Sequence, residues 1–161
     1  MAYTRKRTAK RTRPKDRTCY ETAVYLLQFR DQSEKDLTRK LKEREYTEKE
    51  IEEAMERLRD YEYVNDEDLA DELFEAYRRR AQYGDAYIHQ KLKLKGLATE
   101  KHLQLEEEIE MAAALLQKKW GMSPKLRTDF KKSASFLLRR GFSHDAVMTV
   151  MHEMDFEETA E

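Results

Sequence analysis

The chain has 161 residues, of which 40% are charged, a formal net charge of −1 and a single cysteine, Cys19. One cysteine excludes an internal disulfide framework and a multi-thiolate zinc site, and is typical of a reducing compartment. The sequence shows neither an apolar run of about 18 residues nor the pattern of a secretory signal, so we expect a cytoplasmic protein without a membrane span.

The first 17 residues are strongly basic. They contain eight Lys or Arg and one acid, Asp16, so their formal charge is +7, and the net charge of −1 leaves −8 on the remainder. Residues 1–18 are therefore predicted to form a disordered or loosely attached tail that attracts nucleic acid or an acidic protein surface. A solubilising tail without a specific partner is the alternative. The tail residues proposed for this electrostatic contact are Arg5, Lys6, Arg7, Lys10, Arg11 and Arg13.

Three amphipathic helices are predicted after the tail. The first ends near Arg30, Ser33 caps the second, and Thr47 with Glu50 forms a capping box before the third. Leucine is also far commoner than valine and isoleucine together, which favours helices over strands. The residues expected to face the core of these helices are Tyr20, Ala23, Val24, Leu27, Leu37, Leu41, Ile51, Ala54, Met55 and Leu58.

Two further helices are predicted in the middle of the chain. Asn65 is a strong cap for a helix that begins at Asp66, Gly84 breaks that helix, and Gly96 ends the next one. The apolar stripe of the first of these helices contains Leu69, Ala70, Leu73, Phe74, Tyr77 and Ala81, and that of the second contains Ile88 and Leu92.

Four helices are predicted in the C-terminal part. Thr99 caps a sixth helix with His102 on its core stripe, and the continuous stripe that follows it ends at Gly121. The pattern leaves open whether the sixth helix stops before the seventh begins. Ser123 followed by proline starts an eighth, and Ser143 caps a ninth. The acidic run Glu106–Glu108 is interpreted as a solvated helix face. The core residues expected in this part are Leu105, Ile109, Ala112, Ala113, Leu116, Trp120, Leu126, Phe130, Ala134, Leu137, Val147, Val150, Met151 and Met154.

An internal repeat connects these helices. Leu41, Tyr46 and Ile51 share their spacing with Leu92, Leu97 and His102, and with Leu137, Phe142 and Val147; Glu45, Gly96 and Gly141 follow the same offsets. These offsets of 51 and 45 residues predict an all-α protein of three tandem three-helix repeats, stacked into an elongated, curved array. The predicted boundaries are 1–18 for the basic tail, 19–62, 63–110 and 111–156 for the repeats, and 157–161 for a C-terminal tail.

Basic residues gather in two of the predicted repeats, and we expect them to form a partner-binding surface. Solvated helix faces are the alternative, because charged residues are normal on any surface. Tyr83 and Tyr87 flank Gly84 and either stack on a base or close the repeat's own core. The predicted partner-binding residues are Arg78, Arg79, Arg80, Lys91, Lys93, Lys95, Lys131, Lys132, Arg139 and Arg140.

Several segments resemble the RecX family of bacterial regulators of the RecA recombinase. Tyr63-Val64-Asn65-Asp66 with Leu69-Ala70 and Tyr77 resembles the central signature of that family. Gly84 with Lys95-Gly96 and the Arg140-Gly141-Phe142 turn resemble its later patterns. Three positions depart from the family: Leu69 replaces Phe, Glu45 replaces Gly, and His102 replaces an aliphatic residue. The resemblance covers roughly residues 20–155.

The resemblance implies a non-enzymatic, monomeric modulator of DNA repair, recombination and the SOS response. Such a protein lies along the groove of the RecA filament on single-stranded DNA and inhibits ATP hydrolysis and strand exchange, with at most weak direct DNA contact. The alternative is a helical-repeat nucleic-acid-binding protein that acts without RecA.

No residue pattern in the sequence indicates catalysis or a cofactor. The four histidines show no metalloprotease spacing, Cys19 has no nearby histidine, and no Walker or Rossmann glycine pattern is present. We therefore expect no enzyme activity, no catalytic residue, no metal and no cofactor.

Overall fold

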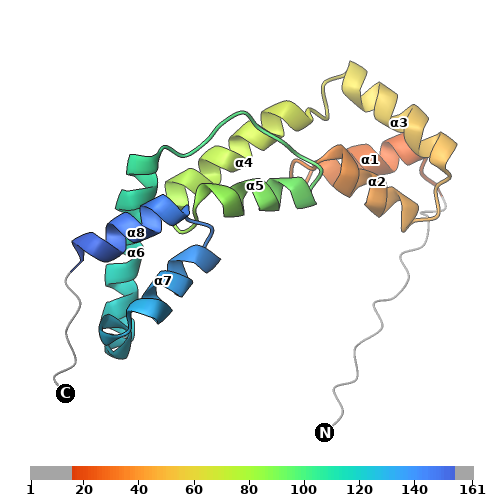
Figure 1. The fold of residues 1–161 in the computed structure, drawn as a ribbon. Coiled ribbons are helices and arrows are strands. Elements are labelled where there is room, and N and C mark those ends of the chain that lie inside the picture. Colours follow the sequence, from red (N-terminus) through yellow and green to blue (C-terminus); the bar gives the residue numbers. More distant parts are fainter. Residues whose placement is uncertain (1–15, 155–161) are drawn as a thin grey trace, which may run out of the picture. The chain divides into compact units, whose positions relative to one another are not determined.

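The computed structural model describes residues 16–154, and within them the fold is all-α, without any strand (Figure 1). The predicted all-α helical-repeat fold is confirmed, whereas the basic tail residues Arg5 to Arg13 lie outside the described range. The curvature of the array and the repeat boundaries stay predictions. The elements are α1 Cys19–Leu27, α2 Glu34–Lys42, α3 Glu48–Asp60, α4 Asp66–Arg80, α5 Asp85–Leu94, α6 Leu105–Met122, the 3-10 helix η1 Pro124–Thr128, α7 Phe130–Arg139 and α8 His144–Glu153.

The chain divides into two compact units, one up to Leu69 and one from Ala70 onward. In the first unit, α1 packs on α2 and α3 around a core that includes Leu37, Leu41 and Leu58, all fully buried (Figure 1). Ser33 and Thr47 accept hydrogen bonds from the backbone three residues on, so both predicted caps are confirmed. Among the described residues, no helix is long and apolar enough to cross a membrane.

In the second unit, the C-terminal core forms where α6 packs on α7 and α8 (Figure 1). Trp120 is buried there, and its Nε1 donates to Ser133 Oγ at 3.0 Å. Ser133 in turn donates to the carbonyl oxygen of Leu126 at 2.8 Å, so no polar atom of this contact is left unsatisfied. The remaining elements of this unit are η1, α5 and most of α4.

The threefold repeat is visible in three equivalent turns. Glu45, Gly96 and Gly141 all adopt a left-handed backbone, with φ angles of 66°, 72° and 84°. In each turn the next residue, Tyr46, Leu97 or Phe142, is buried and donates its N–H to the carbonyl of a buried leucine five residues earlier. The same backbone conformation, the same hydrogen bond to a leucine five residues earlier and the same burial occur at all three turns, which confirms the repeat that the sequence predicted.

The structure corrects the prediction for the segment after Gly96. Residues 97–104 are not helical, and α6 begins only at Leu105, with Gln104 and Glu107 forming its capping box. Thr99 does not cap a helix: its hydroxyl donates to Asp71 Oδ1 on α4 at 2.5 Å and accepts from the N–H of Lys101, only two residues on, at 3.2 Å. The expected sixth and seventh helices are therefore one helix, α6, which contains Gly121 and ends one residue later.

Two more details differ from the sequence prediction. His102 is not a core residue, because 59% of its side chain is exposed and the neighbouring Leu103 is buried instead. The expected eighth helix is split into η1 and α7, since Asp129 interrupts it and caps α7 by accepting from the N–H of Lys132 at 3.0 Å. This second break gives α7 its own N-terminus.

Candidate partner-binding surface

The three arginines at the end of α4 differ in their surroundings. Arg78 is held by acids: its guanidinium donates to Glu107 Oε1 at 2.5 and 2.8 Å and also lies 3.4 Å from Glu75. Arg79 and Arg80 are exposed. Arg78 therefore joins α4 to α6 within the second unit, and it is less available for a partner than Arg79 and Arg80.

The carboxylates around Arg78 are shifted toward their charged forms. A hydrogen bond from the N–H of Gln104 and the bonds from Arg78 lower the pKa of Glu107. The Lys101 ammonium, 3.0 Å from Glu75, lowers the pKa of that carboxyl as well. Both acids are therefore ionised near neutral pH and neutralise the basic residues beside them.

A different set of predicted residues is brought together around two stacked tyrosines. The rings of Tyr83 and Tyr87 are parallel within 6° with centroids 3.9 Å apart, and Tyr77 meets both edge-on. Arg140 lies over Tyr83 at 5.2 Å, and Lys91 lies over Tyr87 at 5.1 Å. The tyrosines therefore pair with each other and carry a cation at either end of the pair.

The same arrangement continues onto α6. Arg140 also lies 5.3 Å from the ring of Phe136, and Lys119 lies 5.5 Å from that ring. We define the basic–aromatic ladder as the alternating row Lys91, Tyr87, Tyr83, Arg140, Phe136 and Lys119. Its three cations repel one another, but each is attracted by a ring face, so the row keeps concentrated positive charge in place.

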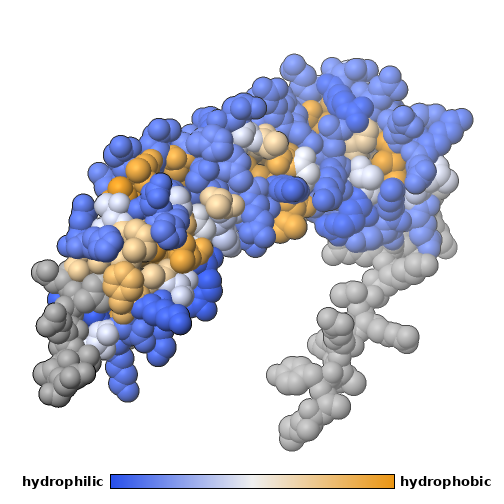
Figure 2. All heavy atoms as spheres, viewed as in Figure 1, coloured by the Kyte–Doolittle hydropathy of each residue, from blue (hydrophilic) through white to orange (hydrophobic). Residues whose placement is uncertain are grey.

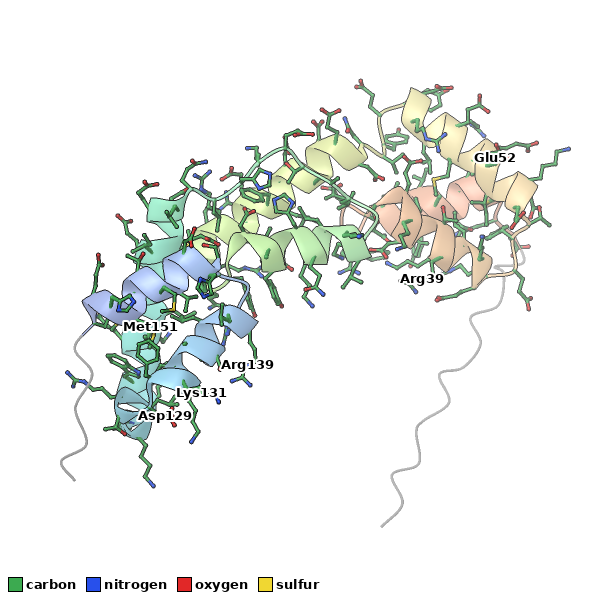
Figure 3. All side chains as sticks on the ribbon, viewed as in Figure 1. Arg39, Glu52, Asp129, Lys131, Arg139 and Met151 are labelled. Atoms are coloured by element: carbon green, nitrogen blue, oxygen red, sulfur yellow. The ribbon has the colours of Figure 1, made fainter. Side chains whose placement is uncertain are left out.

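The remaining predicted cations lie at or near the ends of α5 and α7. Lys93 is exposed, Lys131 is exposed on α7, and Lys95 is the half-buried C-cap of α5. Lys132 lies 3.3 Å from Asp129, and Arg139 Nε donates to the carbonyl of Ser135 at 3.3 Å. Figure 3 labels Lys131 and Arg139 on α7, which adds positive charge to the helix that carries Phe136.

The backbone fixes the ladder through two glycines. The N–H of Gly84 donates to the carbonyl of Arg140 at 2.9 Å, which places the loop before α5 against the turn after α7. A Cβ atom at Gly84 would lie 2.3 Å from the carbonyl oxygen of Gly141, and one at Gly141 would lie 2.4 Å from Tyr87 Cβ. This close approach of the two backbone segments places the Arg140 side chain over the ring of Tyr83.

A buried carboxylate, Glu108, reinforces the same junction. Its Oε1 accepts from the N–H of Asp85 at 2.9 Å, and its Oε2 accepts from Ser143 Oγ at 2.5 Å. Glu108 thus satisfies the N-terminus of α5, where Gly84 has no side chain to do so, and also contacts the cap residue of α8. The interpretation of Glu106–Glu108 as a solvated face is wrong for Glu108, which is only 4% exposed.

Two histidines that are 13 positions apart in the sequence come together with an acid. His102 Nδ1 lies 2.8 Å from Asp85 Oδ2, His89 Nε2 lies 3.5 Å from the same oxygen, and the two imidazole rings stack at 4.5 Å. Their sequence separation hid this cluster, because only the non-helical segment 97–104 returns His102 to α5. Spacing within one helix predicts only that Asp85 and His89, which are four residues apart, lie close together.

The hydrophobic surface is divided among separate places. Figure 2 shows hydrophilic residues over most of the visible face, with hydrophobic residues reaching the surface in patches. In the first unit, the exposed rings of Tyr25 and Phe29 meet edge-on at 5.1 Å, and Arg17 lies 4.3 Å over Tyr25.

The first unit also carries an exposed ion pair. Arg39, labelled in Figure 3, pairs with Glu43 at the end of α2 at 2.7 Å.

The architecture defines a class: an all-α protein of repeated helical units that carries a basic–aromatic surface on its second unit. Residues 19–58 match the first three-helix domain of RecX, and residues 106–151 match its third three-helix domain. The chain belongs to the RecX family of regulatory proteins.

Sequence relatives support this membership over most of the chain. The chain is similar to the regulatory protein RecX of Actinobacillus pleuropneumoniae serotype 5b, with 33% identity over 88% of this chain and 95% of the relative. For RecX of Trichlorobacter lovleyi the identity is 29% over 80% of this chain and 90% of the relative. RecX of Bacillus subtilis is 26% identical, and the match covers 55% of its length.

Solved structures share the fold. The crystal structure of RecX from Lactobacillus salivarius matches with a TM-score of 0.73 at 24% identity, over 86% of this chain and 96% of that one. A second crystal structure of a regulatory protein RecX gives a TM-score of 0.74 at 23% identity, over 84% of this chain and 72% of that one. A regulatory role follows from the family, and the family and the fold together favour a non-enzymatic protein.

Proposed function

We propose that this protein regulates the RecA recombinase by binding its filament on single-stranded DNA, and that it inhibits ATP hydrolysis and strand exchange. Membership in the RecX family supports the target. The basic–aromatic ladder supports the mode of action, because a row of cations held against aromatic rings is suited to an acidic protein or nucleoprotein surface. We propose that the protein acts as a monomer and without a cofactor.

The ladder is the observation that carries the binding mode. Its cations come from α5, α6 and the turn after α7, so the folded second unit is needed to assemble them. Because ring faces already restrict Lys91, Lys119 and Arg140, these side chains lose less conformational freedom on binding than free surface lysines do. Arg and Tyr are also among the residue types that most often dominate binding energy at protein interfaces.

The test is RecA-dependent ATP hydrolysis on single-stranded DNA, titrated with the full chain. We expect the wild-type protein to inhibit, and the double variant Lys91→Glu/Arg140→Glu to need a concentration at least roughly tenfold higher, since a lost anchor costs about 1.4 kcal/mol or more. Lys49→Glu, an exposed charge reversal on α3, is the matched control and should keep the wild-type titration. Circular dichroism confirms that each variant is helical.

Two outcomes would contradict the proposal at different points. A folded wild-type chain that leaves RecA activity unchanged over the titration excludes RecA regulation. If the wild type inhibits and the double variant inhibits equally well, RecA is the target but the ladder is not the contact.

A further inference from the structure

We propose that Asp85, His89 and His102 form a binding site for one divalent transition-metal ion of the zinc class. One ligand atom from each residue lies within 4.8 Å of the other two. Two imidazole nitrogens and a carboxylate oxygen are donors that Zn²⁺ accepts, and they bind it better than they bind Mg²⁺ or Ca²⁺, which prefer oxygen ligands.

The distances are close to those of a metal-bound set. In a tetrahedral zinc site with bonds of about 2.1 Å, neighbouring ligand atoms are about 3.4 Å apart. Asp85 Oδ2 lies 3.5 Å from His89 Nε2 and 2.8 Å from His102 Nδ1. The shorter edge needs to widen by less than about 1 Å, and the edge between the two histidine nitrogens, which is at most 4.8 Å, needs to shorten by up to about 1.4 Å. Because the two rings lie within 22° of parallel, the exposed His102 ring must also rotate to bring its lone pair onto the ion.

The fold holds two of the ligands before any ion binds. Asp85 and His89 are one helical turn apart on α5, so their side chains lie on the same face. The N–H of Leu103 donates to Asp85 Oδ1 at 2.7 Å, which orients the carboxylate and leaves Oδ2 toward the histidines. His89 also packs beside the buried ring of Phe74, with centroids 5.8 Å apart.

Binding replaces two existing hydrogen bonds. The contact between His102 Nδ1 and Asp85 Oδ2 is a hydrogen bond, and an ion between these atoms takes the place of its proton. His89 Nε2 lies 2.9 Å from the carbonyl of Lys101 and must give up that contact in order to ligate. Each imidazole ligates through a ring nitrogen that carries no proton.

The ion would fasten the segment 97–104 to α5. That segment is the part of the middle repeat where a helix was predicted and none forms. It contributes His102, which is the most exposed of the three proposed ligands. Three protein ligands leave a fourth position for water or for an outside ligand. The structural consequence is lower mobility of residues 97–104, with no change in helix content.

Calorimetric titration of the tag-free, metal-free full chain with Zn²⁺ tests the site. We expect one ion per chain, and a dissociation constant at least roughly tenfold larger for both His89→Gln and His102→Gln. His144→Gln, an exposed histidine on α8, is the matched control and should bind as the wild type does. His102 is exposed, so its replacement leaves the core intact.

Co²⁺ gives a second readout that identifies the ligands. Visible absorption bands of four-coordinate Co²⁺ should appear with the wild type and disappear with His102→Gln, without the strong ultraviolet band of a thiolate, because Cys19 is not a ligand. Hydrogen exchange in residues 97–104 should slow when Zn²⁺ is added.

Equal binding by wild type, His89→Gln and His102→Gln would overturn the proposal, as would a loss of binding in His144→Gln alone. Absence of any Zn²⁺ binding by folded wild-type protein would do the same. None of these measurements includes RecA, so their failure is separate from a failure of the proposed function.

Discussion

Single residues decide how closely the loop before α5 can approach the turn after α7. A methyl group at Gly84 would lie 2.3 Å from the carbonyl oxygen of Gly141 and 2.4 Å from its carbon, which are backbone atoms that cannot rotate away. We expect Gly84→Ala to lower the free energy of unfolding by about 3 kcal/mol, because the clash must be relieved by moving backbone. Urea denaturation followed by circular dichroism measures it.

Gly121→Ala is the matched control. A Cβ atom there meets nothing within 4 Å, and Gly121 lies within α6. Alanine is the better helix former, so this variant should gain about 0.5 kcal/mol. Equal stability of Gly84→Ala and the wild type would show that Gly84 and Gly141 are not in contact.

Residue-level predictions from the sequence succeeded where the cause is local. Ser33, Thr47, Asn65 and Ser143 all cap the helices that follow them, because a cap requires only its own side chain and the next three residues. Glu108 was missed because its partners, Asp85 and Ser143, are distant in sequence. An acid inside an acidic run resembles a solvated one until the fold buries it.

At the scale of elements, the repeated turn requires a left-handed backbone at one position, which favours glycine there. The three equivalent positions have left-handed φ angles, and two of them are glycine while the first is Glu45. A left-handed conformation costs a residue with a Cβ atom about 1 kcal/mol. We expect Glu45→Gly to raise the free energy of unfolding of the first unit by about 0.5 to 1 kcal/mol, as measured by thermal and urea denaturation.

The control uses the same substitution in a helix. Glu52 is exposed on α3 (Figure 3), where glycine should cost about 1 kcal/mol relative to a helix-forming residue. The two Glu→Gly variants should therefore change stability in opposite directions. Destabilisation by both would mean that contacts of the Glu45 side chain outweigh its backbone conformation.

Helix boundaries were predictable except around residues 97–104 and near Asp129. Thr99 has the sequence features of a cap, but its hydroxyl donates to Asp71 of α4 and accepts from the N–H of Lys101 in a non-helical segment, and the helix starts later at a second capping box. Propensity and spacing do not include a tertiary partner such as Asp71 on another helix. The same loss of helix moves His102 out of the core and makes it a neighbour of His89.

For the whole molecule, the threefold repeat was the most predictable property, because three copies of a spacing reinforce one another. The partner surface was only partly predictable. Lys91 and Arg140 were singled out as basic residues, yet their association through Tyr83 and Tyr87 depends on the Gly84–Gly141 contact, which joins residues 57 positions apart. Arg78 has the same charge but pairs with Glu107, so charge alone cannot distinguish it from an available cation.

At the scale of the whole chain, the positive charge of residues 1–17 makes the direct nucleic-acid alternative testable. Deleting residues 1–17 changes the formal net charge from −1 to −8, because it removes eight basic residues and one acid. Binding to naked single-stranded DNA should weaken. The slope of log K against log salt concentration should flatten by about 0.7 for each lost phosphate contact. Fluorescence anisotropy at several salt concentrations measures both.

RecA inhibition by the same deletion variant separates the two functions. If the ladder binds the RecA filament, inhibition should persist in the tail-deleted chain and should still be lost on adding Lys91→Glu and Arg140→Glu. If the protein acts on nucleic acid without RecA, inhibition and DNA affinity should fall together on tail deletion, since both would depend on the same phosphate contacts. A parallel loss would therefore favour the direct nucleic-acid function, in which the ladder has no specific protein partner.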